Sequence, residues 1–273
     1  MSSSAPYPER IVCLTEETTE TLYLLGEERR IVGISGFTVR PPRARREKPR
    51  VSAFTSAKIG RILELEPDLA LGFSDLQAGI AAELIRAGVE VHIFNHRSVA
   101  EVLRMIRTLG GMIGCGERAE RLARELETGL AAVRERALAL SRRPRVYFEE
   151  WDEPQISAIR WVSELIEAAG GEDCFPELAA RPLGRDRIVA DPLGVPRRAP
   201  DIILGSWCGK KFRPDEVCGR AGWQDVPAVA SGFVREIKSA LILQPGPAAL
   251  TDGVRAIQEV ILEWAERTSR PSP

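Results

Sequence analysis

One short segment occurs twice in this chain, at two widely separated positions. The copies read PDLALGFS at residues 67–74 and PDIILGSW at residues 200–207. In each copy a Pro-Asp turn leads into a short apolar run that stops near a glycine, which is typical of a strand buried within a parallel sheet. The repeat therefore predicts two lobes of the same kind, each with its own sheet.

Apolar runs of strand length alternate with stretches of helical periodicity through both halves of the chain. Besides the two repeated runs, strands are expected at residues 10–14, 31–34, 89–94, 145–148 and 233–237, and helices at residues 75–87, 98–113, 162–169 and 247–267. Strands that alternate with helices in this way form parallel sheets. The expected fold class is α/β, with two lobes whose mainly parallel sheets are flanked by helices.

Residues 117–140 predict one long α-helix that joins the lobes. Leucines at near-helical spacing support it, and the roughly 24 residues would span about 36 Å at 1.5 Å per residue. The expected division is an N-terminal lobe at 1–115, a linking helix at 116–143 and a C-terminal lobe at 144–273. Because a packed helix restricts motion more than a Gly/Ser linker does, only a small rigid-body closure of the lobes is expected.

Charge and cysteine content exclude several classes of protein. A formal net charge of −1 argues against nucleic acid as a partner. The five cysteines show no CxxC spacing, so neither a zinc ribbon nor a disulfide framework is expected. No apolar run is long enough to span a bilayer, so a membrane-embedded protein is not expected. The first eight residues show no secretion signal, which predicts a cytoplasmic protein, or a periplasmic one if a leader has been removed.

Several short motifs occur in a defined order and spacing. They are RIVCLTEETTE at 10–20, LG at 25–26, VGI at 32–34, PP at 41–42, LELEPDL at 63–69, AGV at 87–89, AGGE at 169–172 and APDII at 199–203. Together with the long central helix, this set resembles the helix-linked substrate-binding proteins of ABC importers, which carry cobalamin, haem and ferric siderophores. The resemblance covers roughly residues 9–264. The cobalamin-binding branch is nearest, through the Pro-Pro loop and YFEEW at 147–151.

The resemblance implies non-catalytic capture of a metal chelate in the cleft between the lobes. Cobalamin or another corrinoid is the first expected ligand, with haem or a ferric siderophore behind it, and no cofactor is required. An ABC permease is the implied protein partner. Family members dock on it through one acidic residue on each lobe, and here Gly79 and a residue near Ile242 fall at those positions, with Asp75 and Glu83 close by. A cytosolic relative that stores, senses or hands over a ligand would explain this departure and the missing secretion signal.

A large conjugated ligand is best held by aromatic faces, with a few polar groups that fix its orientation. The aromatic candidates in expected loops are Phe37, Phe54, Phe73, Trp151, Trp161 and Trp207. The polar candidates beside them are Ser74, Asn95, His96, Arg97, Glu150 and Cys208. Each aromatic could instead fill the core or cap a loop. For Phe73 and Trp207, at the ends of the repeated segments, alanine substitution is expected to weaken binding with little change in melting temperature.

His96 and Cys208 are the candidate metal ligands, and each also has a simpler interpretation. His96 could be a hydrogen-bonded loop histidine, and Cys208 an inert thiol. The competing functional class is a cytosolic metallochaperone or a metal-dependent enzyme that uses Glu150, His96 and Cys208 in the same cleft. Glu149 and Glu150 are neighbours on a strand and point to opposite faces, so they are not expected to act on one bond together.

The densest run of charge is a basic segment near the Pro-Pro loop. It contains Arg40, Arg43, Arg45, Arg46, Lys48 and Arg50. Arginine forks match phosphate and carboxylate geometry, so this run could guide an anionic part of a ligand. The alternative interpretation is a solvated loop.

Overall fold

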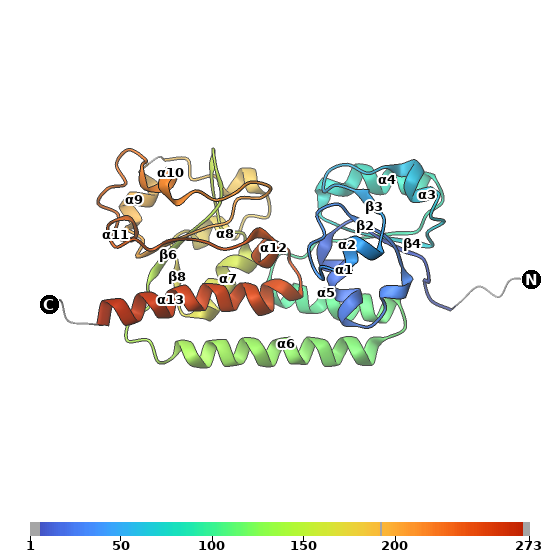
Figure 1. Ribbon diagram of the computed structural model, residues 1–273, viewed down its shortest axis with the longest axis horizontal. Helices are drawn as coiled ribbons and strands as arrows, with labels where there is room; N and C mark the ends of the chain where they lie inside the picture. The colour runs from blue at the N-terminus through green and yellow to red at the C-terminus, as the bar shows by residue number, and fades with distance from the viewer. Residues whose placement is uncertain (1–5, 192, 270–273) are drawn as a thin grey trace, which may run out of the picture. The chain divides into compact units, whose positions relative to one another are not determined.

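The computed structural model describes residues 6–191 and 193–269, which fall into two compact units. Within these residues, unit 1 consists of 6–96, 100–126 and 245–248, and unit 2 consists of the remainder. Each unit contains one mainly parallel sheet with helices packed on it, which confirms the predicted two-lobe α/β fold class (Figure 1).

Unit 1 is built on a parallel sheet in the order β3-β2-β1-β4-β5. Its strands are β1 (Ile11–Cys13), β2 (Ile31–Ser35), β3 (Arg50–Ser52), β4 (Leu69–Phe73) and β5 (Val91–Phe94). The first copy of the repeated segment forms β4, which is buried along its whole length between β1 and β5. A strand covered on both faces has no solvent side, which is why its sequence is apolar without alternation.

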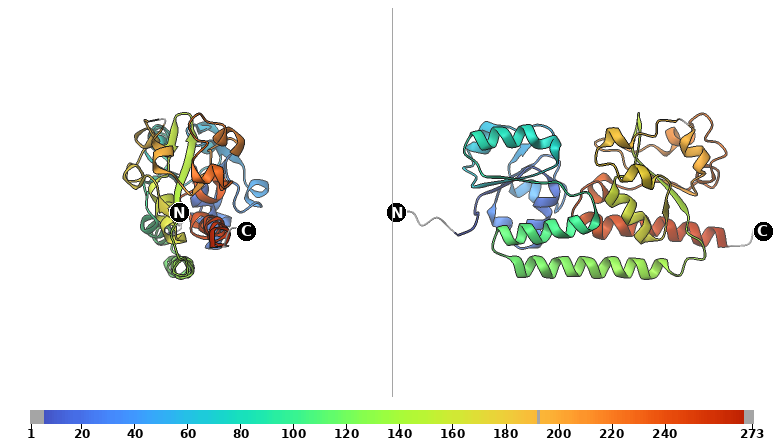
Figure 2. Two further views of the ribbon diagram at one scale, coloured as in Figure 1. Left: turned by 90° about the vertical axis from the view of Figure 1, so that its left-hand side faces the viewer. Right: turned by 180° about the vertical axis from the view of Figure 1, so that it is seen from behind.

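Helices pack on both faces of this sheet (Figure 2). They are α1 (Glu16–Leu24), α2 (Ala44–Glu47), α3 (Ile59–Leu63), α4 (Ala78–Arg86) and α5 (Val99–Met112). The first part of α6 (Gly116–Ala137) also belongs to this unit, and its Ala119 packs against Gly110 of α5. Leu84 of α4 and Ile62 of α3 are fully buried against Val12 and Ala70 of the central strands. The apolar stripe of each helix thus supplies the core that the sheet needs on that face.

Unit 2 contains a second sheet in the order β10-β9-β6-β7, with β8 also paired to β6. Its strands are β6 (Arg145–Asp152), β7 (Gln155–Ser157), β8 (Glu172–Asp173), β9 (Ile202–Gly205) and β10 (Val234–Glu236). The second copy of the repeated segment forms β9, a buried strand parallel to both β6 and β10. β7 alone among these strands is antiparallel, because it returns directly from β6 through a short turn.

The helices of unit 2 are mostly short. They are α7 (Arg160–Ala169), α8 (Pro176–Ala179), α9 (Gly194–Arg198), α10 (Pro214–Cys218), α11 (Pro227–Ala230), α12 (Ser239–Ile242), α13 (Val254–Ser269) and the second part of α6. The long helix predicted at 117–140 is α6, which ends three residues earlier, at Ala137. No helix among the described residues is both long enough and apolar enough to cross a membrane.

Gly205, at the end of β9, lies directly under the ring of Phe212. A Cβ atom at residue 205 would lie 1.8 Å from Phe212 Cε2, and that ring is fully buried, so it has no room to retreat. We expect Gly205→Ala to lower the free energy of unfolding by about 1 to 3 kcal/mol through overpacking. Urea denaturation measures this, with Gly129→Ala on α6 as the control. A Cβ atom at residue 129 would have no neighbouring atom within 4 Å, so this substitution should be neutral or stabilising.

Candidate ligand-binding site

The carboxyl edge of the unit 1 sheet brings together candidates from four strands. Phe37 follows β2, Phe54 follows β3, Phe73 ends β4, and Asn95 and His96 follow β5. Because the strands are parallel, their carboxyl ends share one edge, which is where open α/β sheets bind ligands. Phe37 is 52% exposed and Phe54 is half-buried, so both rings are accessible at this edge.

Phe73 and His96 pack against each other beneath this edge. Their ring centroids are 4.9 Å apart in an edge-to-face arrangement, and Phe73 is only 7% exposed. His96 is also buried, with Nε2 2.7 Å from the carbonyl oxygen of Pro245. Phe73→Ala is therefore expected to lower the melting temperature as well as the affinity, because removing a buried phenylalanine costs packing energy.

Gln77 is a residue of this edge that the sequence analysis did not identify. Its amide Nε2 donates to the carbonyl oxygens of Leu14 at 3.3 Å and Phe54 at 2.9 Å, while Oε1 accepts from the Phe73 amide at 2.9 Å. The fully buried side chain thus fixes the chain where β1, β3 and β4 end. A glutamine near a strand end carries no local signal for such a role. Two of its three partners, Leu14 and Phe54, are distant in the sequence, and only the sheet order brings them together.

The other polar candidates of unit 1 lie close to the same edge. Ser74 has a φ of 68°, a left-handed value that is strained for a side chain with a Cβ, and its Oγ accepts from the Leu76 amide at 3.2 Å. Strain of this kind is concentrated at functional sites. Asn95 is exposed and, with Glu101, lines a small pocket of about 210 Å³. Arg97 is half-buried and belongs to unit 2.

In unit 2, the carboxyl ends of β6 and β9 carry two tryptophans that share one lysine. Lys210 Nζ lies 4.6 Å from the ring centroid of Trp151 and 4.7 Å from that of Trp207, and 2.6 Å from the Asp152 carboxylate. Both contacts are cation–π interactions. Trp151 is half-buried, whereas Trp207 is 3% exposed and packs on Phe212. Trp151 is therefore the more accessible ring, and for Trp207, as for Phe73, a small effect of alanine on the melting temperature is no longer expected.

A buried carboxylate holds Trp207 in place. Glu149 is fully buried and accepts hydrogen bonds from Arg220 at 2.6 and 2.9 Å, from Trp207 Nε1 at 3.1 Å and from Tyr147 Oη at 3.1 Å. Burial and the Glu149 charge raise the pKa of Tyr147 well above its ordinary value. Burial alone would lower the pKa of Arg220, but the hydrogen bond and charge of Glu149 outweigh it and raise that pKa.

Glu150 belongs to a different ion pair from its neighbour. Its carboxylate receives two hydrogen bonds from the buried Arg187, at 2.8 and 2.9 Å. Glu149 and Glu150 therefore pair with separate arginines, in agreement with their expected opposite directions on the strand. The Glu150 carboxylate can still accept a hydrogen bond from a ligand, because bidentate pairing with arginine leaves lone pairs on its oxygens.

The remaining candidates differ in accessibility. Trp161 at the start of α7 is buried, and its Nε1 donates to the carbonyl oxygen of Ile242 at 2.9 Å, so this ring is part of the unit 2 core. Cys208 is exposed and directly follows Trp207. His96 belongs to unit 1 and Cys208 to unit 2. In the part of the chain that the structure describes, no group of three or more His, Cys, Asp or Glu side chains is arranged to hold a metal ion.

These two α/β units, with aromatic rings at the carboxyl edges of their sheets, place the protein in the class of α/β solute-binding proteins. The chain belongs to the periplasmic binding protein family, whose model matches residues 11–241. The members of this family bind solutes and do not transform them. The chain is therefore a binding protein and not an enzyme, as the sequence analysis expected.

Individual relatives agree with this assignment. An ABC transporter substrate-binding lipoprotein of Bacillus subtilis is 24% identical over 271 residues, which cover 93% of this chain and 80% of the relative. A cobalamin-binding protein of Halobacterium salinarum is 28% identical over 88% of this chain, which spans 66% of that relative. Among solved structures, the periplasmic haem-binding protein RhuT from Roseiflexus sp. RS-1 superposes with a TM-score of 0.77 at 27% identity, covering 93% of this chain and 99% of the neighbour. The vitamin B12-binding protein BtuF of Vibrio cholerae superposes with a TM-score of 0.73 at 22% identity, covering 94% and 98%, which supports the fold.

Proposed function

We propose that this chain captures a metal chelate of the corrinoid class, with haem or a ferric siderophore as the next candidate, for an ABC-type importer. The observation that carries the proposal is the set of accessible aromatic rings at the carboxyl edges of both sheets, Phe37, Phe54 and Trp151. Flat aromatic faces suit a large conjugated ring, because they desolvate it without requiring a matching pattern of hydrogen bonds.

The relatives support this order of ligands. The Halobacterium relative and a Vibrio parahaemolyticus relative at 23% identity are named as binders of cobalamin and vitamin B12, and the RhuT neighbour as a haem-binding protein. Two of the accessible ring positions are fixed before a ligand arrives, since Gln77 holds the backbone carbonyl of Phe54 and Lys210 lies over the ring of Trp151. Such preorganisation reduces the entropy that binding must otherwise remove.

A titration panel tests the proposal. The protein is titrated with cyanocobalamin, dicyanocobinamide, haemin and ferrichrome while tryptophan fluorescence is followed. We expect saturable quenching by at least one corrinoid with a Kd below about 10 μM, which corresponds to about 7 kcal/mol of binding free energy. If only haemin or only ferrichrome gives saturable quenching, that compound takes the place of the corrinoid as the proposed ligand. No saturation by any of the four would reject the proposal.

The accessible rings should contribute to affinity more than to stability. We expect Phe37→Ala and Trp151→Ala each to weaken binding of the chelate by about tenfold, since aromatic anchors dominate such sites. The control is Tyr7→Ala, because Tyr7 is 45% exposed but precedes β1 and so lies away from the carboxyl edge. If the same titration gives equal affinities for wild type, Phe37→Ala and Trp151→Ala, these two rings do not contact the ligand.

We further propose that the protein acts outside the cytoplasm and delivers its ligand to an ABC permease. The family assignment favours this location over the cytoplasmic one expected from residues 1–8, of which residues 1–5 lie outside the described part of the chain. Glu83, exposed on α4, is the candidate acid for permease contact in unit 1. Fractionation of the native organism with an antibody against the chain tests the location, and recovery only in the cytosol would contradict it.

A further inference from the structure

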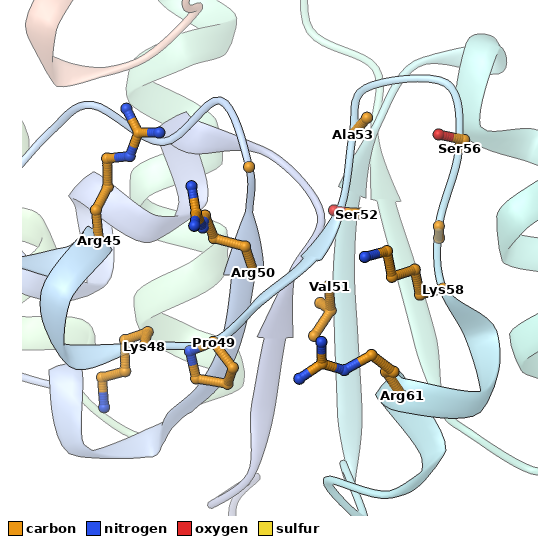
Figure 3. Close-up of a pocket in the computed structure, with 12 residues that line it drawn as sticks. Arg45, Lys48, Pro49, Arg50, Val51, Ser52, Ala53, Ser56, Lys58 and Arg61 are labelled. Atoms are coloured by element: carbon orange, nitrogen blue, oxygen red, sulfur yellow. The ribbon is translucent and has the colours of Figure 1, made fainter.

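Unit 1 contains a strongly basic pocket beside the edge strand β3, and neither Phe37 nor Phe54 is part of its lining. The pocket has a volume of about 630 Å³. Its lining includes five basic side chains and no acidic one, and Figure 3 shows the basic groups entering from both sides. The five are Arg45, Lys48, Arg50, Lys58 and Arg61. Arg45 belongs to α2, Arg50 to β3 and Arg61 to α3, whereas Lys48 directly follows α2 and Lys58 directly precedes α3.

The backbone around this pocket is well fixed. Residues 53–58 fold back along the outer side of β3, where the Lys58 amide donates to Val51 O at 2.9 Å and the Ala53 amide donates to Ser56 O at 2.7 Å. An isolated bridge also joins Ser52 to Ala57. The basic side chains therefore extend from an ordered frame, and the hydroxyl of Ser56 adds a hydrogen-bond donor to the lining.

The structure separates the basic run of the sequence into two sets. Arg40 and Arg43 form ion pairs, with Glu20 at 2.7 Å and with Glu28 at 3.0 Å. By contrast, no ion pair within residues 6–191 and 193–269 involves Arg45, Arg50 or the two basic side chains on the opposite wall. The basic side chains on the pocket wall therefore differ from Arg40 and Arg43, whose charges are paired with acids.

The nearest carboxylate in the sequence, Glu47, interacts electrostatically with Lys48 but lies outside the pocket lining. Glu47 accepts a hydrogen bond from Tyr23 Oη at 2.7 Å and lies 3.6 Å from Arg43, and it is not part of the lining. One or two lysines on an edge strand discourage pairing with other sheets. That role does not require five cations around one hollow, since their mutual repulsion is unfavourable unless an anion lies among them.

We propose that this pocket binds a multivalent oxyanion that carries phosphate, either a small soluble anion or the headgroup of an anionic lipid. Arginine offers paired N–H donors that match phosphate oxygens, and lysine adds a mobile point charge. The site lies within unit 1, where its lining residues Gly36 and Ala53 directly precede Phe37 and Phe54 in the chain. Variants of the basic side chains, tested with each ligand in turn, are therefore needed to distinguish this site from the chelate site.

Calorimetry with inorganic pyrophosphate tests the soluble form, using the full chain at low ionic strength. We expect binding that weakens as salt is added, because the contacts are exposed to solvent. The double variant Arg50→Gln/Lys58→Gln should bind at least about tenfold more weakly, the equivalent of about 1.4 kcal/mol. Arg46→Gln is the matched control, because Arg46 belongs to the same basic run but does not line the pocket.

Vesicle sedimentation tests the lipid form, with phosphatidic acid vesicles compared with pure phosphatidylcholine vesicles. If the wild type binds pyrophosphate and the double variant does not, the site is assigned to a soluble anion. If the wild type binds only the vesicles, and the double variant does not, the site is assigned to a lipid headgroup. Failure of both probes, or equal binding by wild type and double variant, would overturn the proposal. The chelate titration on the double variant keeps the two functions apart, since it should be unchanged.

Discussion

Replacing Glu149 by glutamine is expected to lower the free energy of unfolding by about 3 to 5 kcal/mol, the cost of leaving one member of a buried ion pair without its partner. Glu149 is fully buried and Arg220 is largely buried, so neither can exchange the lost contact for water. Glutamine keeps the shape of the side chain and removes its charge. The loss therefore reports on the uncompensated arginine and on the weaker bonds to Trp207 and Tyr147.

Chemical denaturation of paired variants measures this effect. Glu263→Gln is the control, because Glu263 pairs with Arg235 at 3.2 Å on the surface, where such pairs contribute at most about 1 kcal/mol. The double variant Glu149→Leu/Arg220→Leu should recover part of the loss, since it buries no unpaired charge. A loss for Glu149→Gln no larger than that of the control would show that this pair is not important for stability.

The second large effect concerns pH and Glu17. Burial raises the pKa of Glu17 to about 7, although the hydrogen bond donated by Thr15 Oγ1 at 2.5 Å acts to lower it. The folded protein therefore holds this proton more tightly than the unfolded chain does, whose pKa is near 4.5. By linkage, the burial of Glu17 costs nothing below about pH 4.5, and the cost grows to about 3 kcal/mol as the pH rises to 7.

Glu17→Gln should remove this pH dependence. We expect the variant to be more stable than wild type above pH 7, and to lose the fall in stability that wild type shows between about pH 4.5 and 7. Urea denaturation at a series of pH values measures both curves. Glu64→Gln is the control for a general charge effect, because Glu64 is exposed. Parallel curves for wild type and Glu17→Gln would show that Glu17 is already ionised throughout this range.

Local patterns in the sequence were sufficient for most long elements. The two repeated segments are β4 and β9, and the helix predicted at 117–140 is α6. β3, β7 and β8 were not predicted, because strands of two or three residues are too short to show a period. The last helix was predicted from residue 247, but α13 begins at Val254, since residues 249–253 form a wider, π-type turn that has a similar apolar pattern.

The site was predictable only in part. Parallel sheets place ligand contacts where strands end, and this rule selected Phe73 and Trp207 at the ends of the repeated segments, but both rings are buried. The accessible rings Phe37, Phe54 and Trp151 were selected as aromatics in expected loops, and so was Trp161, whose ring is buried. A strand end shows that a side chain is near an edge, but packing decides whether that side chain faces solvent.

The sequence by itself determined the α/β alternation, the duplication of the central strand and the long helix, because each depends on the spacing of apolar residues within one short stretch. Only the tertiary structure decided which charges are paired and which are not. Glu149 forms an ion pair with Arg220, 71 residues away. Arg50 and Lys58 instead line one pocket whose lining contains no acidic residue. Ion pairing and burial depend on which distant segments the sheet order brings together, and the spacing of residues along the chain does not encode that order.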